Sequence, residues 1–207
     1  KSLTGIMTKL HQCKYRFGLT GTLDGTQTHK LVLEGLFGAV EKVVSTKELI
    51  DKNTLANLKI KCIVLKHPIK KERMDYAEEM DYLVSKVSRN NFILDLCNNI
   101  SGNTLCLFQL VEKHGKILYE GMKERENVYF VYGGTDTDQR EKIRGLVEGH
   151  KNSTTIASYG TFSTGINIRN INNIVLASPS KSKIRVLQSI GRGLRTSSTK
   201  DSILIFD

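Results

Sequence analysis

The chain has 207 residues with a hydrophobic fraction of 39%, which suits one sizeable folded domain or one domain with part of another. No apolar run approaches the roughly 20 residues of a membrane span, and Lys1–Gly5 lacks an initiator Met and the apolar core of a signal peptide. We therefore expect a cytoplasmic protein whose chain continues before Lys1. The formal net charge of +10 favours a polyanionic partner, with nucleic acid as the first candidate.

The predicted strands are short apolar runs, several of them apolar at consecutive positions, as is typical of strands covered on both faces. In chain order they are Tyr15–Leu19, Lys61–Leu65, Thr104–Phe108, Val128–Tyr132, Thr155–Ser158, Ile174–Ala177 and Ile203–Phe206. The stretch from Gly38 to Leu58 is less regular and carries scattered charge, which predicts a connector.

Helical patterns fill the gaps between these runs. Apolar residues recur at spacings of three and four between Phe92 and Ile100, and Asp138–Glu148 places its apolar residues on one side. Asp136, with Gln139 three residues later, predicts a helix start. Alternating strands and helices predict an α/β fold with a mostly parallel sheet, in which ligands bind beyond the carboxyl ends of the strands.

The cysteines carry no metal-binding pattern. Cys13, Cys62, Cys97 and Cys106 form no CxxC pair, and none stands beside a His at ligand spacing. Reduced, mostly buried thiols and no metal site are the expectation. His29 and His114 stand among polar neighbours, and we expect both at the surface.

The most informative segment is Gln188-Ser189-Ile190-Gly191-Arg192-Gly193-Leu194-Arg195, which follows a helical pattern over Lys183–Leu187. Gln188, Arg192 and Arg195 are four and three residues apart, so they are predicted to share one helix face. Two guanidinium groups and an amide together suit a triphosphate whose γ-phosphoryl gains charge in the transition state. Gly191 and Gly193 each weaken a helix by roughly 1 kcal/mol relative to Ala, which indicates close approach of another backbone or a ligand.

A second interpretation of the same segment is a solvated basic helix end with glycines at its C-cap. No Asp or Glu occurs from Ser178 to Lys200, a stretch that contains Lys181, Lys183, Arg185, Arg192, Arg195 and Lys200. The residues alone leave both interpretations open.

The segment resembles motif VI of the superfamily 2 helicases, QxxGRxxR, at all four fixed positions. Other segments resemble further motifs of that family in the family's order: Gly18–Thr22 motif III, Thr104–Phe108 motif IV, Tyr132–Gly134 with Gln139 and Arg140 the strand-Gly-helix segment that follows, and Ser158–Ile168 motif V. Within the family, the chain is similar to the UvsW-type recombination helicases of tailed phages. The shared phrases include Ala-Ser-Tyr-Gly-x-Phe-Ser-Thr-Gly-Ile.

The resemblance implies a fold and an activity. The fold is a RecA-like parallel sheet flanked by helices over residues 59–207, the helicase C-terminal lobe, after the end of a first RecA-like lobe at 1–37 and a connector at 38–58. The activity is that of an ATP-dependent DNA helicase or translocase that uses ATP and Mg²⁺. Its implied substrate is branched DNA, or duplex DNA with single-stranded regions, in recombination, repair or replication. A phage-encoded protein would work in the host cytoplasm.

The resemblance also implies roles for individual residues. Arg192 and Arg195 would be arginine fingers, and Gln188 would contact phosphate or the attacking water. The nucleotide side would be completed by Gly165, Asn167 and Gly191. Nucleic-acid contacts would come from Phe108, Gln109, Gly133, Gly134, Arg140, Ser163 and Thr164. Coupling between lobes would involve Thr20, Gly21 and Thr22. For Phe108, a place in the core is the alternative.

The sequence departs from the family in motif V, where Ser158 or Tyr159 replaces the common Thr, and at two further points. Asn167 stands where motif V usually carries Asp, so its role in coupling is in question. The chain holds neither a G-x-x-x-x-G-K-[ST] loop nor an acidic DExx box, the parts that would bind the phosphates and Mg²⁺. We expect both before Lys1, and we expect the chain alone to hydrolyse no ATP.

Three other functions fit the same motifs. An RNA helicase and the translocating subunit of a restriction enzyme use the same motor parts, and the residues do not distinguish DNA from RNA. A non-catalytic RecA-like module that only binds nucleic acid is the alternative from another class. An arginine pair favours the motor, because a pure binder has no need of it.

Overall fold

The computed structural model describes residues 2–21, 27–66, 68, 73–165, 167–197 and 200–207. Contacts divide the chain into two compact units, Lys1–Ser45 and Thr46–Asp207, which we call the N-terminal and C-terminal units. Over the described residues, no helix has both the length and the apolar character needed to cross a membrane.

The N-terminal unit contains helices α1 (Ser2–Lys9) and α2 (Gln27–Phe37). The strand predicted at Tyr15–Leu19 is wrong, because this segment forms neither helix nor strand. Its apolar side chains lie at the surface, with Phe17 84% and Leu19 99% exposed. A strand needs a neighbouring strand to pair with, and this segment pairs with none in the described part of the chain.

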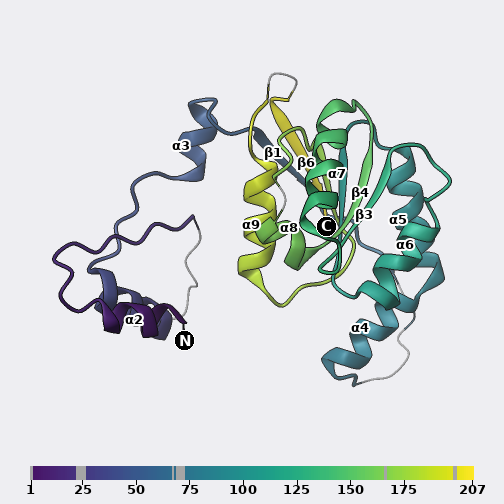
Figure 1. Cartoon of the computed structure of the whole chain (residues 1–207). Helices are drawn as coiled ribbons and strands as arrows, with labels where there is room; N and C mark the ends of the chain where they lie inside the picture. The colour runs from purple at the N-terminus through teal and green to yellow at the C-terminus, as the bar shows by residue number, and fades with distance from the viewer. Residues whose placement is uncertain (1, 22–26, 67, 69–72, 166, 198–199) are drawn as a thin grey trace. The chain divides into compact units, whose positions relative to one another are not determined.

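The C-terminal unit is built around one sheet with helices on both faces (Figure 1). Its strands are β1 (Asn57–Lys61), β2 (Thr104–Phe108), β3 (Val128–Val131), β4 (Thr154–Ser158), β5 (Asn173–Leu176) and β6 (Ser202–Phe206). The strand order is β1-β6-β5-β2-β4-β3, and every pairing is parallel. The predicted α/β fold with a parallel sheet is confirmed.

One helix precedes β1, and the other helices and the π-helix η1 connect the strands. They are α3 (Thr46–Asp51), α4 (Tyr76–Ser85), α5 (Val87–Asn99), η1 (Val111–Gly115), α6 (Lys116–Glu120), α7 (Thr137–Gly149), α8 (Tyr159–Gly165) and α9 (Lys183–Gly193). The predicted start of α7 is confirmed, because the Asp136 side chain accepts a hydrogen bond from the Gln139 N–H at 2.8 Å.

The first strand of the sheet is displaced from its prediction. We expected Lys61–Leu65, whereas β1 covers Asn57–Lys61. β1 pairs residue by residue with β6 until Lys61 meets Phe206. Because β6 ends there, Val64 has no strand beside it and is exposed.

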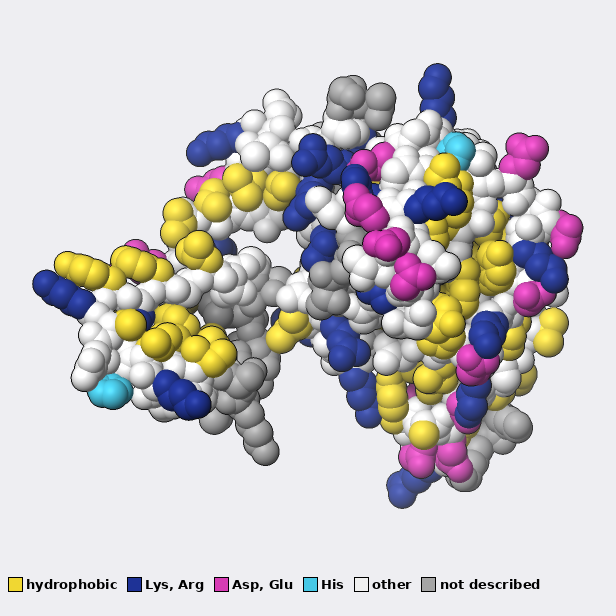
Figure 2. All heavy atoms as spheres, viewed as in Figure 1, with side chains coloured by type: hydrophobic (Ala, Val, Ile, Leu, Met, Phe, Trp, Pro, Cys, Tyr) yellow, Lys and Arg dark blue, Asp and Glu magenta, His cyan; other side chains and the backbone are white. Residues whose placement is uncertain are grey.

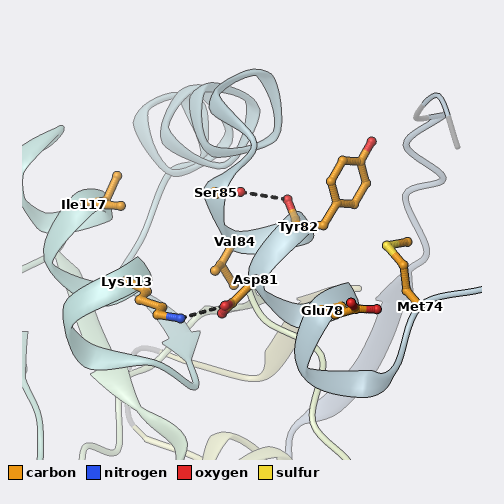
Figure 3. A pocket seen from close by; sticks show the side chains of 8 residues that line it. All are labelled: Met74, Glu78, Asp81, Tyr82, Val84, Ser85, Lys113 and Ile117. Atoms are coloured by element: carbon orange, nitrogen blue, oxygen red, sulfur yellow. Dashed lines mark hydrogen bonds and ion pairs between the residues drawn. The ribbon is translucent and has the colours of Figure 1, made fainter. Parts of the chain in front are cut away.

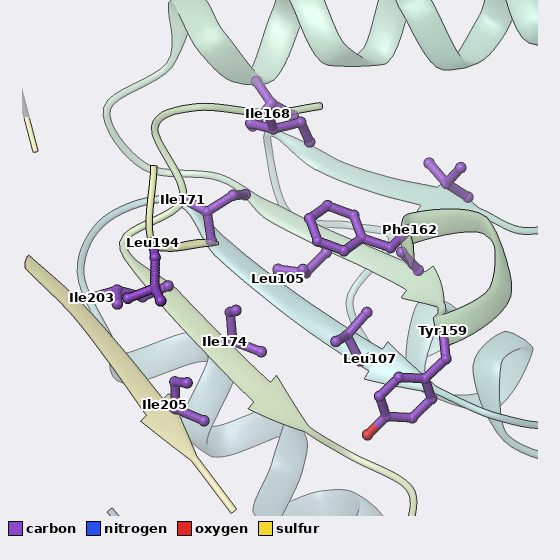
Figure 4. Packing of buried hydrophobic residues seen from close by; sticks show 13 residues of the cluster. Leu105, Leu107, Tyr159, Phe162, Ile168, Ile171, Ile174, Leu194, Ile203 and Ile205 are labelled. Atoms are coloured by element: carbon purple, nitrogen blue, oxygen red, sulfur yellow. The ribbon is translucent and has the colours of Figure 1, made fainter. Parts of the chain in front are cut away.

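The core lies on both faces of the sheet because successive side chains of a strand point to opposite sides. On β2, Leu105 and Leu107 pack in the cluster under α7, α8 and α9 (Figure 4). Cys106 and Phe108, the alternate residues, pack in the cluster under α5 and α6. This double cover explains why the whole strand is apolar.

An open pocket of about 790 Å³ lies beside α4 and η1 (Figure 3). Its lining includes Tyr82 and Val84 of α4, and Lys113 of η1 forms an ion pair with Asp81 at 2.7 Å. None of the site residues predicted from the sequence lines this pocket.

Candidate functional site

Helix α9 carries most of the glutamine–arginine segment. The Ser182 side chain caps its start by accepting a hydrogen bond from the Arg185 N–H at 3.4 Å. Val186 and Ile190 pack against the core on one side of the helix. Gln188 and Arg192 are four residues apart on this helix, so they share a face as predicted.

Arg195 lies beyond the helix, which is a correction to the predicted single face. The C-cap of α9 is Leu194, and Arg195 instead forms an antiparallel bridge with Leu55, just before β1. Gly193 is the last residue of the helix, so the third polar side chain is placed by the bridge to Leu55 and not by helical periodicity.

The Arg195 guanidinium nevertheless has a defined partner. Its Nη1 donates a hydrogen bond to the Asn167 side-chain oxygen. Asn167 follows α8, and α8 packs beside α9 in the sheet's helical layer (Figure 1). The segments that resemble motifs V and VI therefore meet at this bond.

The surroundings of the two arginines are electropositive. Partial burial lowers the pKa of Arg192, and the nearby charge of Arg195 lowers it further. An anion placed beside both guanidinium groups would relieve this repulsion. Figure 2 shows Lys and Arg side chains gathered where α9 lies, while Asp and Glu gather over α7.

Lys200 adds a buried positive charge at the end of α9. Its ammonium group donates a hydrogen bond to the Gly193 carbonyl, one of the carbonyls that end a helix without an intrahelical partner. Burial lowers the pKa of Lys200 to about 8. The contact holds the end of α9 against the loop that leads to β6.

The two glycines of the segment have different surroundings. A Cβ on Gly193 would meet the Cδ1 of Ile203 and, at 2.8 Å, the Cδ1 of Ile174. This glycine is therefore explained by close packing of α9 on β5 and β6. A Cβ on Gly191 would meet nothing within 4 Å, so the chain itself leaves room there for another molecule.

The arginine pair does not lie beyond the carboxyl ends of the strands, where ligands were expected. The Ala56 N–H, one residue before β1, donates to the Leu194 carbonyl at 2.8 Å, so α9 ends at the amino end of β1. A helix that follows a parallel strand runs back along the sheet, and α9 therefore carries its last residues to the opposite edge.

The carboxyl edge holds a separate group of predicted residues. Gln109 follows β2, and Gly133 and Gly134 follow β3, so both loops leave this edge of the sheet. Arg140 of α7 donates to the Gly133 carbonyl at 3.0 Å, which ties the glycine loop to the helix after it. The predicted site residues therefore form two groups, which lie at opposite edges of the same sheet.

Phe108 belongs to the core and not to the surface. It has no exposed area, and its ring stacks on Phe130 with centroids 5.6 Å apart. The alternative that placed Phe108 in the core therefore holds, and its side chain is not available to a strand of nucleic acid.

Other predicted residues are placed only by their backbone or not at all. Ser163, Thr164 and Gly165 form the end of α8. Thr20 and Gly21 lie in irregular backbone of the N-terminal unit. Thr22 is outside the described residues.

His114 was expected at the surface, and this expectation is wrong. The residue has no exposed area, and burial, followed by the charge of Arg89, lowers its pKa to about 4. Neighbours such as Lys113 and Lys116 are polar, so the local sequence carries no sign of burial. The π-helix turns His114 inward while Lys113 remains outside.

The cysteines are free, with Cys97 and Cys106 buried and Cys13 and Cys62 exposed. The expectation of mostly buried thiols therefore holds for two of the four.

Comparison with known proteins identifies the family. The helicase conserved C-terminal domain family matches residues 85–197. The chain belongs to this family. It is 35% identical over its whole length to the ATP-dependent DNA helicase uvsW of Enterobacteria phage T4 and covers 43% of that protein. It is 33% identical, over 49% of its length, to the putative ATP-dependent helicase IRC3 of Saccharomyces cerevisiae and covers 15% of that protein.

Solved structures agree with this placement. The crystal structure of T4 UvsW matches with a TM-score of 0.63 at 34% identity, over 100% of this chain and 41% of that one. A fragment of a putative HsdR subunit of a type I restriction enzyme from Vibrio vulnificus matches with a TM-score of 0.67 at 17% identity, over 91% of this chain and 38% of that one. The latter likeness shows the fold alone. The C-terminal unit is a helicase C-terminal RecA-like lobe, and the chain spans less than half the length of these relatives.

Proposed function

We propose that this helicase C-terminal domain is the second lobe of an ATP-dependent DNA helicase or translocase and that it acts on ATP held by another lobe. The observation that carries the proposal is the hydrogen bond from Arg195 to Asn167, which holds one guanidinium beside Arg192 at the end of α9. Two neighbouring guanidinium groups stabilise the charge that builds on a γ-phosphoryl during transfer.

The roles follow from the chemistry of the groups. Arg192 and Arg195 are the arginine fingers, and Gln188, on the same helix face as Arg192, orients phosphate or the attacking water. Asn167, Gly165 and Gly191 complete the nucleotide side, and the open space at Gly191 supports a close approach.

These residues fit the phosphates of ATP and not its metal ion. Guanidinium and amide groups bind phosphate oxygens, whereas Mg²⁺ prefers carboxylates and water. The lobe that supplies a phosphate loop and acidic box would therefore hold Mg²⁺ and most of the ATP. Mg²⁺ held there would supply positive charge to the phosphates, and Arg192 and Arg195 would add the charge of two guanidinium groups.

The DNA track is proposed for the carboxyl edge of the sheet. It comprises Gln109, Gly133, Gly134 and Arg140, together with Ser163 and Thr164 of α8. Backbone amides and Arg bind phosphates without reading sequence, which suits a motor that moves along DNA. DNA is favoured over RNA because the relative that matches the whole chain is a DNA helicase. Branched DNA in recombination or repair is the substrate class we propose.

The N-terminal unit would supply the coupling between lobes. In this proposal residues 1–37 are the end of the first RecA-like lobe, and the second lobe is the C-terminal unit, whose sheet includes β1 from Asn57 onwards. Changes in the nucleotide would be transmitted to the second lobe through Thr20, Gly21 and Thr22.

The test uses a polypeptide that joins this chain to a phosphate-loop lobe. Arg195→Ala and Arg192→Ala should each lower DNA-stimulated ATP hydrolysis by about 10³-fold or more while DNA binding changes little. Lys183→Ala, at the other end of α9, is the matched control and should leave turnover unchanged. If ATP turnover survives both arginine substitutions, the finger assignment is refuted. This chain would then contribute only nucleic-acid binding to the joined polypeptide.

A further inference from the structure

Three strand ends of the C-terminal unit meet at Ser178, the second residue after β5. Its hydroxyl oxygen accepts a hydrogen bond from the backbone N–H of Gln109, which follows β2, at 3.2 Å. Its carbonyl accepts one from the hydroxyl of Tyr159, which follows β4, at 2.9 Å. Ser178 is almost completely buried. The shape of the carboxyl edge therefore depends on how this one residue is held.

The Ser178 hydroxyl also contacts Nδ1 of His114 at 2.7 Å. On the other side of the ring, Nε2 lies 3.2 Å from the side-chain oxygen of Asn90. Both His114 and Asn90 are buried. A chain of hydrogen bonds thus runs from α5 through η1 to the loops that follow β5 and β2.

The direction of each bond in this chain follows from one fixed amide. The Asn90 side-chain nitrogen donates to the Val84 carbonyl at 2.8 Å, so its oxygen faces His114 as an acceptor. Nε2 of His114 must then carry the proton, which leaves Nδ1 as an acceptor. The Ser178 hydroxyl therefore donates to Nδ1, and its lone pairs remain free to accept from Gln109.

The neutral ring is required by this arrangement. A second proton on Nδ1 would remove the acceptor of the Ser178 hydroxyl proton. The charged Arg89, which donates to the Ala177 carbonyl at 2.7 Å, also disfavours a positive ring. Cys106 and Tyr159, the other titratable groups near Arg89, are buried and carry raised pKa values, so both stay uncharged near neutral pH.

The backbone around His114 is specialised for this contact. The N–H groups of His114 and Gly115 both donate to the Leu110 carbonyl, which gives the wide turn of η1. A Cβ on Gly115 would lie 2.5 Å from the Phe108 ring, so only glycine lets this turn approach β2 so closely. π-helical turns are rare in proteins, and those that exist are often found at functional sites.

We propose that His114 is a positioning residue that sets the DNA-binding conformation of the carboxyl edge through Ser178. Its neutral ring, protonated on Nε2, orients the Ser178 hydroxyl, which in turn fixes the backbone at Gln109. The inference rests on the proposed function, because it assigns His114 to the DNA track proposed above. Val84, whose carbonyl accepts the hydrogen bond from Asn90, is also one of the residues that line the pocket beside α4 (Figure 3).

The experiment measures binding of fluorescein-labelled single-stranded DNA to the chain by fluorescence anisotropy. His114→Leu should weaken binding about tenfold, and Ser178→Ala should weaken it to a similar extent. Combining the two should add little, because both break the same link. His114→Asn places an amide oxygen near the position of Nδ1 and should restore most of the affinity. His150→Leu, a histidine at the amino edge, is the control and should bind as the native chain does.

The outcomes separate this inference from the proposed function. A native chain that binds no DNA would refute the proposed track itself. If the native chain binds DNA and the folded His114→Leu and Ser178→Ala variants bind it with the same affinity, only the role of His114 is refuted. Should the variants fail to fold, ¹⁵N NMR of the native ring decides, because a protonated Nδ1 near neutral pH would overturn the assigned hydrogen bonds.

Discussion

Arg195 and Asn167 are 28 residues apart in sequence, and a hydrogen bond joins the guanidinium of one to the side-chain oxygen of the other. The position of Asn167 usually carries Asp in the family that the sequence resembles. An amide oxygen accepts the same bond as a carboxylate, so the contact survives the change. Unlike a carboxylate, the amide adds no negative charge beside the Arg195 guanidinium.

This relationship predicts how position 167 tolerates substitution. Asn167→Ala should lower DNA-stimulated ATP turnover about tenfold in a polypeptide that includes the phosphate-loop lobe, because Arg195 loses the acceptor that orients it. Asn167→Asp should stay close to the native rate, because it preserves an acceptor. On the chain alone, Asn167→Asp should raise the free energy of unfolding by at most about 1 kcal/mol, as expected of an exposed ion pair. Equal turnover of the native and Ala forms would show that the bond orients nothing.

The two glycines of the arginine segment should respond oppositely to alanine. Gly193→Ala should destabilise the chain by about 1–3 kcal/mol, because the new methyl meets the buried Ile203 and Ile174. Gly191→Ala should stabilise it by about 0.5–1 kcal/mol, because helix propensity improves in open space. Urea denaturation measures both.

Gly191→Ala also tests the proposed nucleotide side. A variant that is more stable yet hydrolyses ATP more slowly would support a close approach of nucleotide at Gly191. Unchanged turnover would make this glycine a feature of the helix end only.

The buried His114 predicts a loss of stability in acid. The pKa of His114 is about 4 in the folded chain and about 6.5 when unfolded, so between these values the unfolded state binds the additional proton. Stability from this group is therefore complete above about pH 6.5 and is lost as the pH falls towards 4, by roughly 3 kcal/mol in total. Unfolding of the native chain and of His114→Leu should be compared from pH 7 to pH 4. Parallel pH profiles would contradict the assignment of this loss to His114.

The proposed DNA track predicts a steep dependence on salt. With about four phosphate contacts, the dissociation constant for single-stranded DNA should rise roughly 50-fold from about 50 mM to about 200 mM salt, because contacts release counterions. Arg140→Gln should make the slope shallower by about 0.7, whereas Lys142→Gln, an exposed residue of the same helix, should not change it. Binding that is insensitive to salt would argue against a phosphate track at this edge.

Much of the fold follows from patterns within a few residues. The strand at Thr104–Phe108 is apolar at nearly every position because both faces are covered, and its predicted bounds are confirmed. The start of α7 is set by a capping hydrogen bond between Asp136 and Gln139, which are three residues apart. Tyr15–Leu19 carries a similar apolar run and forms no strand, because pairing depends on a neighbour that sequence alone does not place.

The sequence by itself determined the helicase C-terminal family, the parallel sheet, and the residue types that suit phosphate, since motifs and periodicity are local properties. Only the tertiary structure decided that Arg195 meets Asn167, that the arginine pair and the glycine loop after β3 lie at opposite edges of the sheet, and that His114 is buried. Each of these depends on contacts between segments far apart in the chain. Such contacts arise when strands pair and helices cross back over the sheet, and no short stretch of residues encodes them.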